Sequence, residues 1–198
     1  MPQIREPKQE RSIEKKQKIV DAGYKLFAEK GYYNTNTAEI AKKANVSTGI
    51  VYGYFKDKRD ILLNILETYI EKISSPVFSL LDNISSPVKY EEVLPIIIDK
   101  TICAHRINSK IHEALHSMTH TDEEVARRFV DLEDKLTLNI EDKLRSLGEN
   151  IESMREKIHL AICIIQAFSH ETIYDEHSYI DYPKMKEIVL KTLIKLFK

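Results

Sequence analysis

The histidines are the side chains whose number and spacing could support metal chemistry. The sequence has seven of them, and four lie in one short region, namely His105, His112, His116 and His120. On a helix the last three would be one turn apart, so two imidazoles could reach the same ion, with Glu113 or Cys103 nearby. No dense group of cysteines and carboxylates accompanies them. The lining of a ligand pocket, or plain surface, is therefore the stronger interpretation, and we predict no bound metal.

Two glutamate and histidine pairs raise a second possibility. Glu113 precedes His116 by three residues, and Glu156 precedes His159 by the same spacing, as carboxylate-bridged di-iron helical bundles require. Such a centre also needs glutamates from two further helices, which the sequence does not single out. The sequence also contains no Gly-rich phosphate loop, HExxH or GxSxG. We predict no enzyme and no cofactor, and keep a metal-binding helical bundle, di-iron or metal-sensing, as the alternative.

The stretch from Thr37 to Lys58, TAEIAKKANVSTGIVYGYFKDK, has a different chemical character. Its residues Ile40 and Ala44 recur at helical spacing, which predicts a first helix of about two turns with one apolar face. Asn36 and Glu39 have the types and spacing of a capping pair, because each side chain can satisfy a backbone amide at the start of that helix.

A tight turn at 45–47 should lead into a second short helix, with Ser47 as its N-cap. In this helix Val51 and Phe55 are four residues apart and should both point inward. Small and aromatic residues then occupy the outward positions: Thr48, Gly49, Ile50, Tyr52, Gly53 and Tyr54. Because a glycine costs about 1 kcal/mol in a helix interior, helix stability does not explain this composition.

A helix that faces DNA does explain it. Small residues let a helix approach the floor of the major groove, while tyrosine hydroxyls, Lys56 and Lys58 can reach flanking phosphates. The same two helices would also fit a plain helical hairpin in the core of an all-α protein, and this alternative stays open from the geometry alone.

The stretch and its flanks resemble the amino-terminal signature of the TetR family of one-component transcriptional regulators. The match runs from Lys16 to Leu66 and agrees in residue type and spacing across three helices and both turns. The residues that carry it are Ala22, Leu26, Phe27, Gly31, Tyr32, Ile40, Ala41, Val46, Ser47, Gly49, Tyr52, Tyr54, Phe55, Lys58 and Leu62. Ile50, Val51 and Gly53 depart from the usual pattern, which affects the expected base preference.

The resemblance implies a homodimeric, ligand-responsive regulator, most simply a repressor, that binds a pseudo-palindromic operator and is released by a small lipophilic or aromatic effector. It assigns base or groove contacts to Thr48, Gly49 and Ile50. It assigns phosphate contacts to a second set: Thr37, Ser47, Tyr52, Tyr54 and Lys58.

Composition and charge agree with an all-α chain of this kind. The 198 residues include five Gly, six Pro and no Trp, and the net charge is -1. Residues 1–58 hold 12 Lys or Arg against 7 Asp or Glu, a balance of +5, and residues 59–198 hold 18 against 24, a balance of -6. A basic head on an acidic body is typical of a DNA-binding domain joined to a regulatory domain.

The chain is expected to be cytoplasmic. Its amino terminus is charged, with no apolar run typical of a signal peptide, and no segment approaches the roughly 20 apolar residues needed to span a bilayer, so no membrane partner is expected. Cys103 and Cys163 have apolar neighbours, so we expect buried free thiols in a reducing compartment.

The pattern predicts four parts along the chain: a flexible arm (1–11), a helix-turn-helix DNA-binding domain (12–58), a connecting helix (59–82), and an effector-binding and dimerisation domain (83–198). Ser74-Ser75-Pro76 should weaken or kink the connecting helix. The last domain should contain helices near the following residues: 88–106, 108–119, 122–147, 151–176 and 183–197.

The run LAICIIQAF, from Leu160 to Phe168, is apolar nearly all round and must be covered on every side. One side can meet the core and the other a second subunit, which predicts a four-helix dimer interface. Its expected residues are Ile158, Ile162, Ile165, Ser169, Met185, Val189, Thr192 and Leu196. The expected effector pocket is lined by Ile98, Thr101, His105, His116, Phe129 and Phe168.

Overall fold

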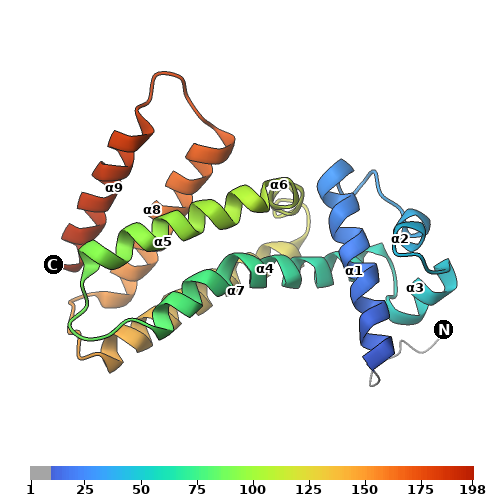
Figure 1. The fold of residues 1–198 in the computed structure, drawn as a ribbon, viewed down its shortest axis with the longest axis horizontal. Coiled ribbons are helices and arrows are strands. Elements are labelled where there is room, and N and C mark those ends of the chain that lie inside the picture. The colour runs from blue at the N-terminus through green and yellow to red at the C-terminus, as the bar shows by residue number, and fades with distance from the viewer. Residues whose placement is uncertain (1–9) are drawn as a thin grey trace. The chain divides into compact units, whose positions relative to one another are not determined.

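The computed structural model describes residues 10–198, and every regular element in this part of the chain is an α-helix (Figure 1). The helices are α1 (Glu10–Lys30), α2 (Thr37–Lys43), α3 (Thr48–Tyr54), α4 (Lys58–Asp82), α5 (Tyr90–Ile107), α6 (Ser109–His116), α7 (Glu123–Ser146), α8 (Met154–Tyr174) and α9 (Tyr182–Phe197). The predicted all-α class is confirmed, and the helices predicted after residue 82 begin and end within three residues of the observed ones.

The chain forms two compact units. The first contains the residues up to Ile70 together with Lys110–Ala126, and the second contains Glu71–Ser109 and Arg127–Lys198. α4 and α7 are continuous helices that contribute to both units. Nothing in the sequence pattern indicated that Lys110–Ala126 packs with the amino-terminal helices.

The predicted arm at 1–11 lies outside the described residues except for Glu10 and Arg11, which belong to α1. α1 ends at Lys30 because Gly31 adopts a φ of 80°, in the left-handed region that favours glycine at a helix end.

The apolar faces of α1 to α4 hold the first unit together. Its largest fully buried side chains are Ile19, Phe27, Ile40, Phe55, Ile61, Leu62, Ile65, Leu66 and Tyr69, joined by Ile111 and Leu115. α2 begins with the predicted capping box. The Glu39 amide donates to Asn36 Oδ1 at 3.0 Å, and the Asn36 amide donates to Glu39 Oε2 at 3.1 Å. Local sequence therefore fixes where α2 starts, and burial fixes which face it turns inward.

Gly23 marks a close approach between α1 and α4. A Cβ atom at this position would lie 2.8 Å from Ile65 Cδ1 and 3.1 Å from Ile61 Cγ2. Gly23→Ala should therefore lower the free energy of unfolding by about 1–3 kcal/mol, the usual cost of overpacking a core. Urea unfolding followed by circular dichroism measures this. Gly53→Ala is the matched control, because a Cβ there meets no atom within 4 Å; a Gly23→Ala variant as stable as the parent would contradict the close packing.

The second unit packs α5, α8 and α9 around a shared core. Its buried residues are Leu94, Ile98, Leu144, Met154, Ile158, Ala161, Ile165, Phe168, Leu193 and Phe197. Tyr90 stacks on Phe197 with ring centroids 5.2 Å apart, which joins the start of α5 to the end of α9. α4, the helix expected to weaken or kink at 74–76, continues through Pro76 to Asp82.

A buried carboxylate fixes α7 against α8. Glu141, only 5% exposed, accepts hydrogen bonds from Arg145 on its own helix and from Arg155 on α8, the latter at 2.7 Å. Arg145 and then Arg155 lower the pKa of Glu141, so the carboxylate stays charged. Because a buried charge is costly without its partners, this cluster specifies which turns of the two helices lie side by side.

Both cysteines are exposed, so the expectation of buried thiols was wrong. Cys163 stands two residues from Ala161 and two from Ile165, both buried, and at 100° per residue it points to the other side of α8. Apolar neighbours predict that a helix is covered, but not which of its residues faces out.

None of the helices in the described part of the chain is long and apolar enough to cross a bilayer.

Candidate nucleic-acid interface and ligand cavity

α2, a short turn and α3 form the predicted helix-turn-helix. Asn45 adopts a φ of 55°, a left-handed conformation that asparagine tolerates better than most residues. The Val46 amide donates to the Ala41 carbonyl at 3.0 Å, which closes the end of α2. Ser47 caps α3, since its hydroxyl accepts from the Ile50 amide at 3.3 Å. The turn therefore fixes the direction in which α3 leaves α2.

α3 has one buried and one exposed face. Val51 and Phe55 are 0% and 1% exposed, as the sequence predicted. Of the three residues predicted to contact bases, Thr48 and Gly49 are exposed and Ile50 is half-buried. The exposed face therefore carries small side chains, which allow close approach of another macromolecule to the helix backbone.

The residues predicted to bind phosphate differ in their surroundings. Two are exposed, Ser47 and Tyr52, and three are half-buried, Thr37, Tyr54 and Lys58. The Tyr54 hydroxyl is hydrogen-bonded to the Ser12 hydroxyl of α1 at 2.8 Å. Tyr54 therefore braces α3 against α1.

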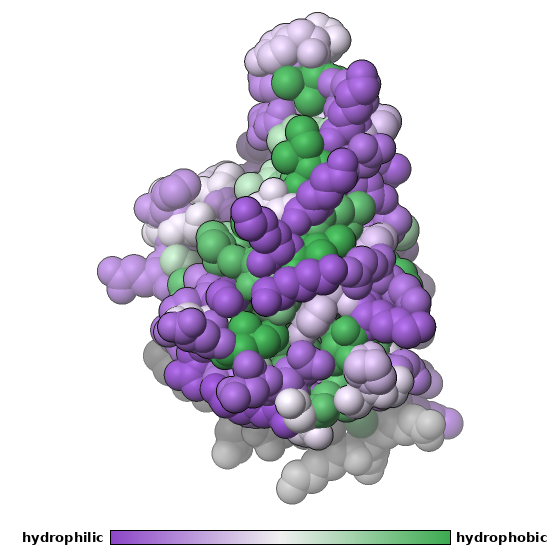
Figure 2. All heavy atoms as spheres, turned by 90° about the vertical axis from the view of Figure 1, so that its left-hand side faces the viewer, coloured by the Kyte–Doolittle hydropathy of each residue, from purple (hydrophilic) through white to green (hydrophobic). Residues whose placement is uncertain are grey.

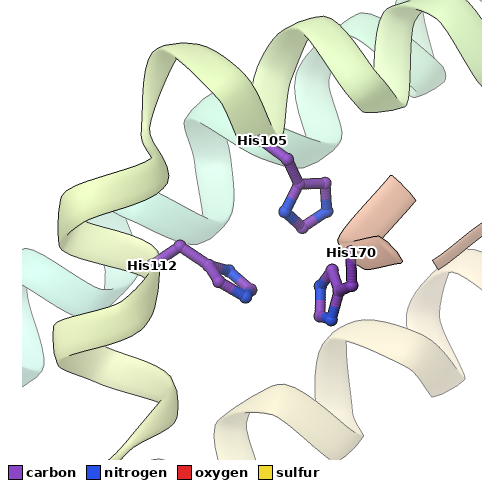
Figure 3. Close-up of side chains that lie close together, drawn as sticks. All are labelled: His105, His112 and His170. Atoms are coloured by element: carbon purple, nitrogen blue, oxygen red, sulfur yellow. The ribbon is translucent and has the colours of Figure 1, made fainter. Parts of the chain in front are cut away.

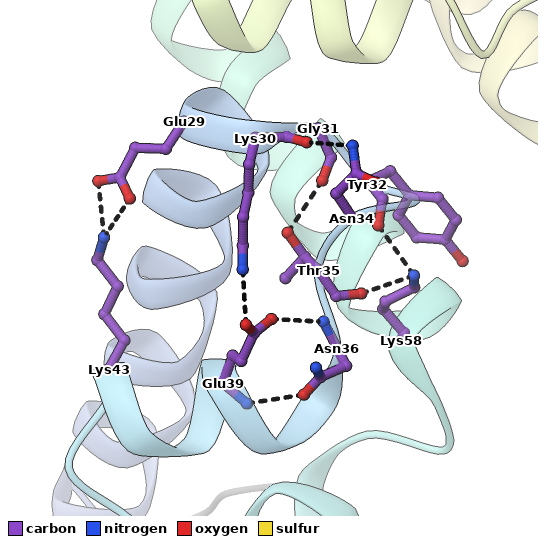
Figure 4. Close-up of polar contacts among 10 residues, drawn as sticks. All are labelled: Glu29, Lys30, Gly31, Tyr32, Asn34, Thr35, Asn36, Glu39, Lys43 and Lys58. Atoms are coloured by element: carbon purple, nitrogen blue, oxygen red, sulfur yellow. Dashed lines mark hydrogen bonds and ion pairs between the residues drawn. The ribbon is translucent and has the colours of Figure 1, made fainter.

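Lys58 has a structural task that the sequence pattern did not indicate. Its Nζ donates to the carbonyls of Tyr32 at 2.9 Å and Thr35 at 2.8 Å, and lies 4.1 Å from the centroid of the Tyr32 ring (Figure 4). Partial burial lowers the pKa of Lys58. An ammonium group has three N–H donors, so these two carbonyls leave one donor for a phosphate.

Two ion pairs attach α2 to α1 (Figure 4). Lys30 lies 2.7 Å from Glu39, and Lys43 lies 2.7 Å from Glu29. The pKa of Glu39 is lowered first by Lys30 and then by the Asn36 amide, and the pKa of Glu29 is lowered first by Lys43. Because solvent screens ion pairs on a surface, they orient α2 more than they stabilise the fold.

Two polar contacts attach the segment at 110–126 to α4 within the first unit. Arg59 Nε and Nη2 each donate to Asp122 at 2.9 Å, a bidentate pair. Asp122 also accepts from the amides of Glu124 and Val125 and so caps α7. Farther along α4, the hydroxyl of Tyr69, which is buried, shares a hydrogen bond with His112 Nδ1. These contacts hold the segment at 110–126 in the first unit.

The Arg59–Asp122 pair should make stability depend on acid pH. The hydrogen bond from Arg59 is the main cause that lowers the pKa of Asp122. The stabilisation is therefore fully present above the unfolded value, about 4, and is lost as the pH falls through the lower folded value. Asp122→Asn should lower the unfolding midpoint at pH 7 but have little effect near pH 2. Asp131→Asn, which removes an exposed pair with Arg127, is the control; equal pH profiles for the two variants would contradict the assignment.

A cavity opens in the second unit, with walls from α4, α5, α7 and α8. It encloses about 950 Å³ of space not occupied by protein atoms, part of it open to solvent. Its walls are mostly aliphatic, with a few polar side chains among them, including Thr101, His105 and Gln166. An apolar cavity with a few polar groups is the usual form of a site for a small lipophilic molecule.

Two of the residues predicted to line an effector pocket, Thr101 and His105, do line this cavity. The other four are not among its lining residues: Ile98, His116, Phe129 and Phe168. Ile98 and Phe168 instead belong to the buried core of the second unit. Gln166 was missed, although it is the only polar side chain in the run from Leu160 to Phe168 and its isolation was a usable signal.

The histidines singled out in the sequence are divided between the two units. In the second unit, His105 of α5 and His170 of α8 face each other with ring centroids 5.0 Å apart (Figure 3). Burial lowers the pKa of His170, which favours the neutral imidazole. In the first unit, the rings of His112 and His116 lie 4.3 Å apart, and His120 is exposed.

α8 and α9 leave apolar side chains at the surface. On α8, Leu160, Cys163 and Ala167 are exposed at steps of three and four residues, so they form one stripe. On α9, Ile188 is 64% exposed. Figure 2 views the side on which α9 lies in Figure 1, and hydrophobic side chains are visible there between hydrophilic ones. A stripe of this kind along a helix indicates an interaction surface more strongly than scattered apolar residues do.

The structure corrects the face of α8 that was assigned to a partner. Ile158, Ile165 and Ser169 are buried within the chain itself, so they are not available at its surface. Four other predicted interface residues are half-buried, Ile162, Met185, Val189 and Leu196, and Thr192 is exposed. A helix that is apolar all round carries no periodic signal, so its sequence could not indicate which side turns inward.

Comparison with known proteins identifies the family. Residues 19–65 match the family model for "Bacterial regulatory proteins, tetR family". The HTH-type transcriptional regulator HbdR of Aromatoleum sp. (strain CIB) is 37% identical over 105 residues, which cover 47% of this chain and 44% of HbdR. The chain thus spans less than half of the length of this relative.

Two crystal structures extend the similarity to the second unit. A protein from Mesorhizobium loti assigned to the TetR family matches with a TM-score of 0.77 at 16% identity, over 95% of this chain and 97% of the other. One from Syntrophomonas wolfei matches with a TM-score of 0.67 at 26% identity, over 93% and 95%. The tetR family signature at 19–65 and the similarity of the helical architecture to solved TetR-family proteins together support a TetR-family regulatory protein.

Proposed function

We propose that the protein is a homodimeric, ligand-responsive transcriptional repressor that leaves its operator when a small lipophilic molecule enters the cavity of the second unit. The exposed face of α3, from Ser47 to Tyr52, is the observation that carries this proposal. It combines a rigid helix, small side chains at its centre and a hydroxyl-bearing tyrosine, which is the surface that a helix needs to enter a major groove.

In this proposal α3 lies in the major groove, with Thr48, Gly49 and Ile50 toward the base edges. Ser47, Tyr52 and the third donor of Lys58 bind phosphates on either side, with Thr37 and Tyr54 beside them. The balance of +5 in residues 1–58 supports the orientation, because cations near the interface release counterions from the duplex.

Two copies of the chain associate through α8 and α9. The exposed stripe of Leu160, Cys163 and Ala167, with Ile188 of α9, supports this interface. A two-fold dimer presents two copies of α3, and these fit successive major grooves of a pseudo-palindromic site.

The cavity holds the effector. Its aliphatic walls favour a lipophilic molecule, and α4 continues from the cavity wall into the first unit, where it packs against α1. If effector and operator prefer different states of the dimer, each must weaken the binding of the other by the same factor. The family assignment disfavours the alternative, a metal-binding bundle.

The test is binding of the purified full chain to the DNA just upstream of its own gene, against a scrambled duplex, over a series of salt concentrations. Specific binding at a two-fold symmetric site is expected, with affinity falling as salt rises. Equal affinity for both duplexes would contradict a regulator of this promoter. Stoichiometric metal together with no DNA binding at low salt would favour the metal-binding alternative.

Tyr52→Phe should weaken binding to every duplex by about the same factor. The variant loses one hydroxyl that donates to a phosphate, a contact worth roughly tenfold or more in affinity. Thr48→Val and Ile50→Ala should instead change the preferred base pairs. Selection from a randomised duplex library separates the two effects, and a changed sequence preference for Tyr52→Phe would contradict this assignment of contacts.

A further inference from the structure

The cavity of the second unit is much longer than it is wide. On α5 its lining residues share one face from Tyr90 to His105, a rise of about 22 Å at 1.5 Å per residue. On α7 they run from Leu132 to Leu144, a rise of about 18 Å. Helices pack with axes roughly 8–10 Å apart, so the space between them is narrow in comparison.

One end of the cavity lies at the start of α5. Tyr90 stacks on Phe197 there, with ring centroids 5.2 Å apart, and both residues line the cavity. Lys143 Nζ donates to the Asp82 carbonyl at 3.4 Å, so the last turn of α7 lies beside the end of α4. Leu144, the last residue of α7 that lines the cavity, therefore lies at this end as well. This end is lined by aliphatic and aromatic side chains, and the Tyr90 hydroxyl already donates to a carboxylate, that of Glu149.

The other end lies at the end of α5. His105 faces His170 of α8 there (Figure 3). α7 and α8 are antiparallel. Thr137 of α7 contacts His159 of α8 at 3.3 Å, whereas Glu141, which is later on α7, contacts Arg155, which is earlier on α8. Later residues of α8, Gln166 among them, therefore lie toward the same end as His105.

Apart from the Tyr90 hydroxyl, which Glu149 already engages, the polar side chains of the cavity gather at this second end. Thr101, His105 and Gln166 belong to it, and Ser74 lies on the first cavity-lining turn of α4. Thr101 Oγ1 donates to the Ile97 carbonyl at 2.8 Å, so its lone pairs can accept a further bond. Among the described residues that line the cavity, none is Asp, Glu, Lys or Arg. A ligand with several charges would therefore lack partners.

We propose that the cavity binds a linear aliphatic molecule with a single hydrogen-bonding head group, a long-chain fatty acid or alcohol. The head lies at Thr101, His105 and Gln166, and the chain extends toward Phe197. This inference rests on the proposed function, since it names the class of the effector. A long, narrow, apolar space that is polar at one end fits a chain better than a fused ring system of equal size.

Direct binding to the full chain tests the class of ligand. Isothermal titration calorimetry with octanoic, dodecanoic and hexadecanoic acid should give an affinity that rises by roughly fourfold per methylene until the channel is filled. Dodecanol should bind comparably to dodecanoic acid if the head is recognised by hydrogen bonds alone, and more weakly if the carboxylate is required. Pyrene binding more tightly than every chain, or affinity independent of chain length, would overturn the proposal.

Two variants test the orientation of the chain. Ile140 lines the apolar half of the cavity, so Ile140→Phe should lower the affinity for hexadecanoic acid by about tenfold or more and leave octanoic acid nearly unchanged. Leu138→Phe, at an exposed position of the same helix, is the matched control. Gln166→Leu should weaken the acid and the alcohol but not dodecane. Equal losses for all chain lengths in an Ile140→Phe protein with unchanged melting temperature would overturn the orientation.

The same titrations separate this inference from the proposed function. Chains that bind but leave a specific operator complex intact support the ligand class and contradict the effector role. A specific operator complex together with no binding of any chain supports the regulator and overturns the ligand class.

Discussion

Gly49→Glu is expected to lower specific operator affinity by roughly 100-fold or more and to leave the fold intact. In the proposed complex Gly49 is the point where α3 comes nearest to the base edges. A glutamate there adds bulk in the groove and a negative charge beside the phosphates, and it removes the close approach that base contacts need. Fluorescence anisotropy with a labelled operator measures the loss.

The folded structure gives no reason for this variant to be unstable. A Cβ atom at Gly49 would meet only the Ser47 hydroxyl, at an ordinary 3.9 Å. Gly49 is also in the first turn of α3, where a negative charge interacts favourably with the helix dipole. Asn139→Glu adds the same charge at an exposed position of α7 and should bind the operator normally. Full affinity of Gly49→Glu with an unchanged melting temperature would exclude α3 from the interface.

Leu160→Arg is expected to separate the dimer into monomers and to lower operator affinity by roughly 10²–10⁴-fold, the usual advantage of two linked binding sites over one. Leu160 is 49% exposed in the single chain and is the first and largest residue of the apolar stripe on α8. In the dimer its burial would force an arginine into an apolar interface with no partner, which is strongly unfavourable. Sedimentation velocity gives the oligomeric state, and anisotropy gives the affinity.

Leu138→Arg provides a matched control for this experiment. Leu138 is 45% exposed, nearly the same as Leu160, but it lies on α7 rather than on the proposed interface. The control should remain a dimer and keep its operator affinity. Dissociation of both variants, or of neither, would place the subunit contact elsewhere on the surface.

The two variants also fail in different ways, which makes them informative together. Gly49→Glu should remain dimeric and lose DNA, whereas Leu160→Arg should lose both. The monomer should keep weak, salt-sensitive binding through a single copy of α3.

Features that depend on neighbours within a few residues could be predicted from the amino-acid sequence alone. The capping pair of Asn36 and Glu39, the Ser47 cap and the inward positions of Val51 and Phe55 were all predicted and all observed. Caps and helical spacing are local, so residue types a turn apart are sufficient to specify them. The helix-turn-helix and the family signature that contains it could be read for this reason.

The rotation of each helix about its own axis depends on the packing of the whole fold. The run from Leu160 to Phe168 is apolar on every side, so its sequence was compatible with several inward faces, and the partner face was placed on residues that the chain buries itself. The same ambiguity led to the expectation that Cys163 is buried. The phase of such a helix is set by what packs against it, here α5 and α9.

Contacts between distant residues were likewise beyond the reach of the sequence. Lys58 was predicted to bind phosphate, but its bonds to the Tyr32 and Thr35 carbonyls depend on where the loop after α1 passes α4. The pairing of Arg59 with Asp122 joins residues far apart in the chain. Local propensity specifies an element and its ends, whereas the lining of a cavity or the partner of a charge depends on how several elements pack together, and no short-range pattern encodes that.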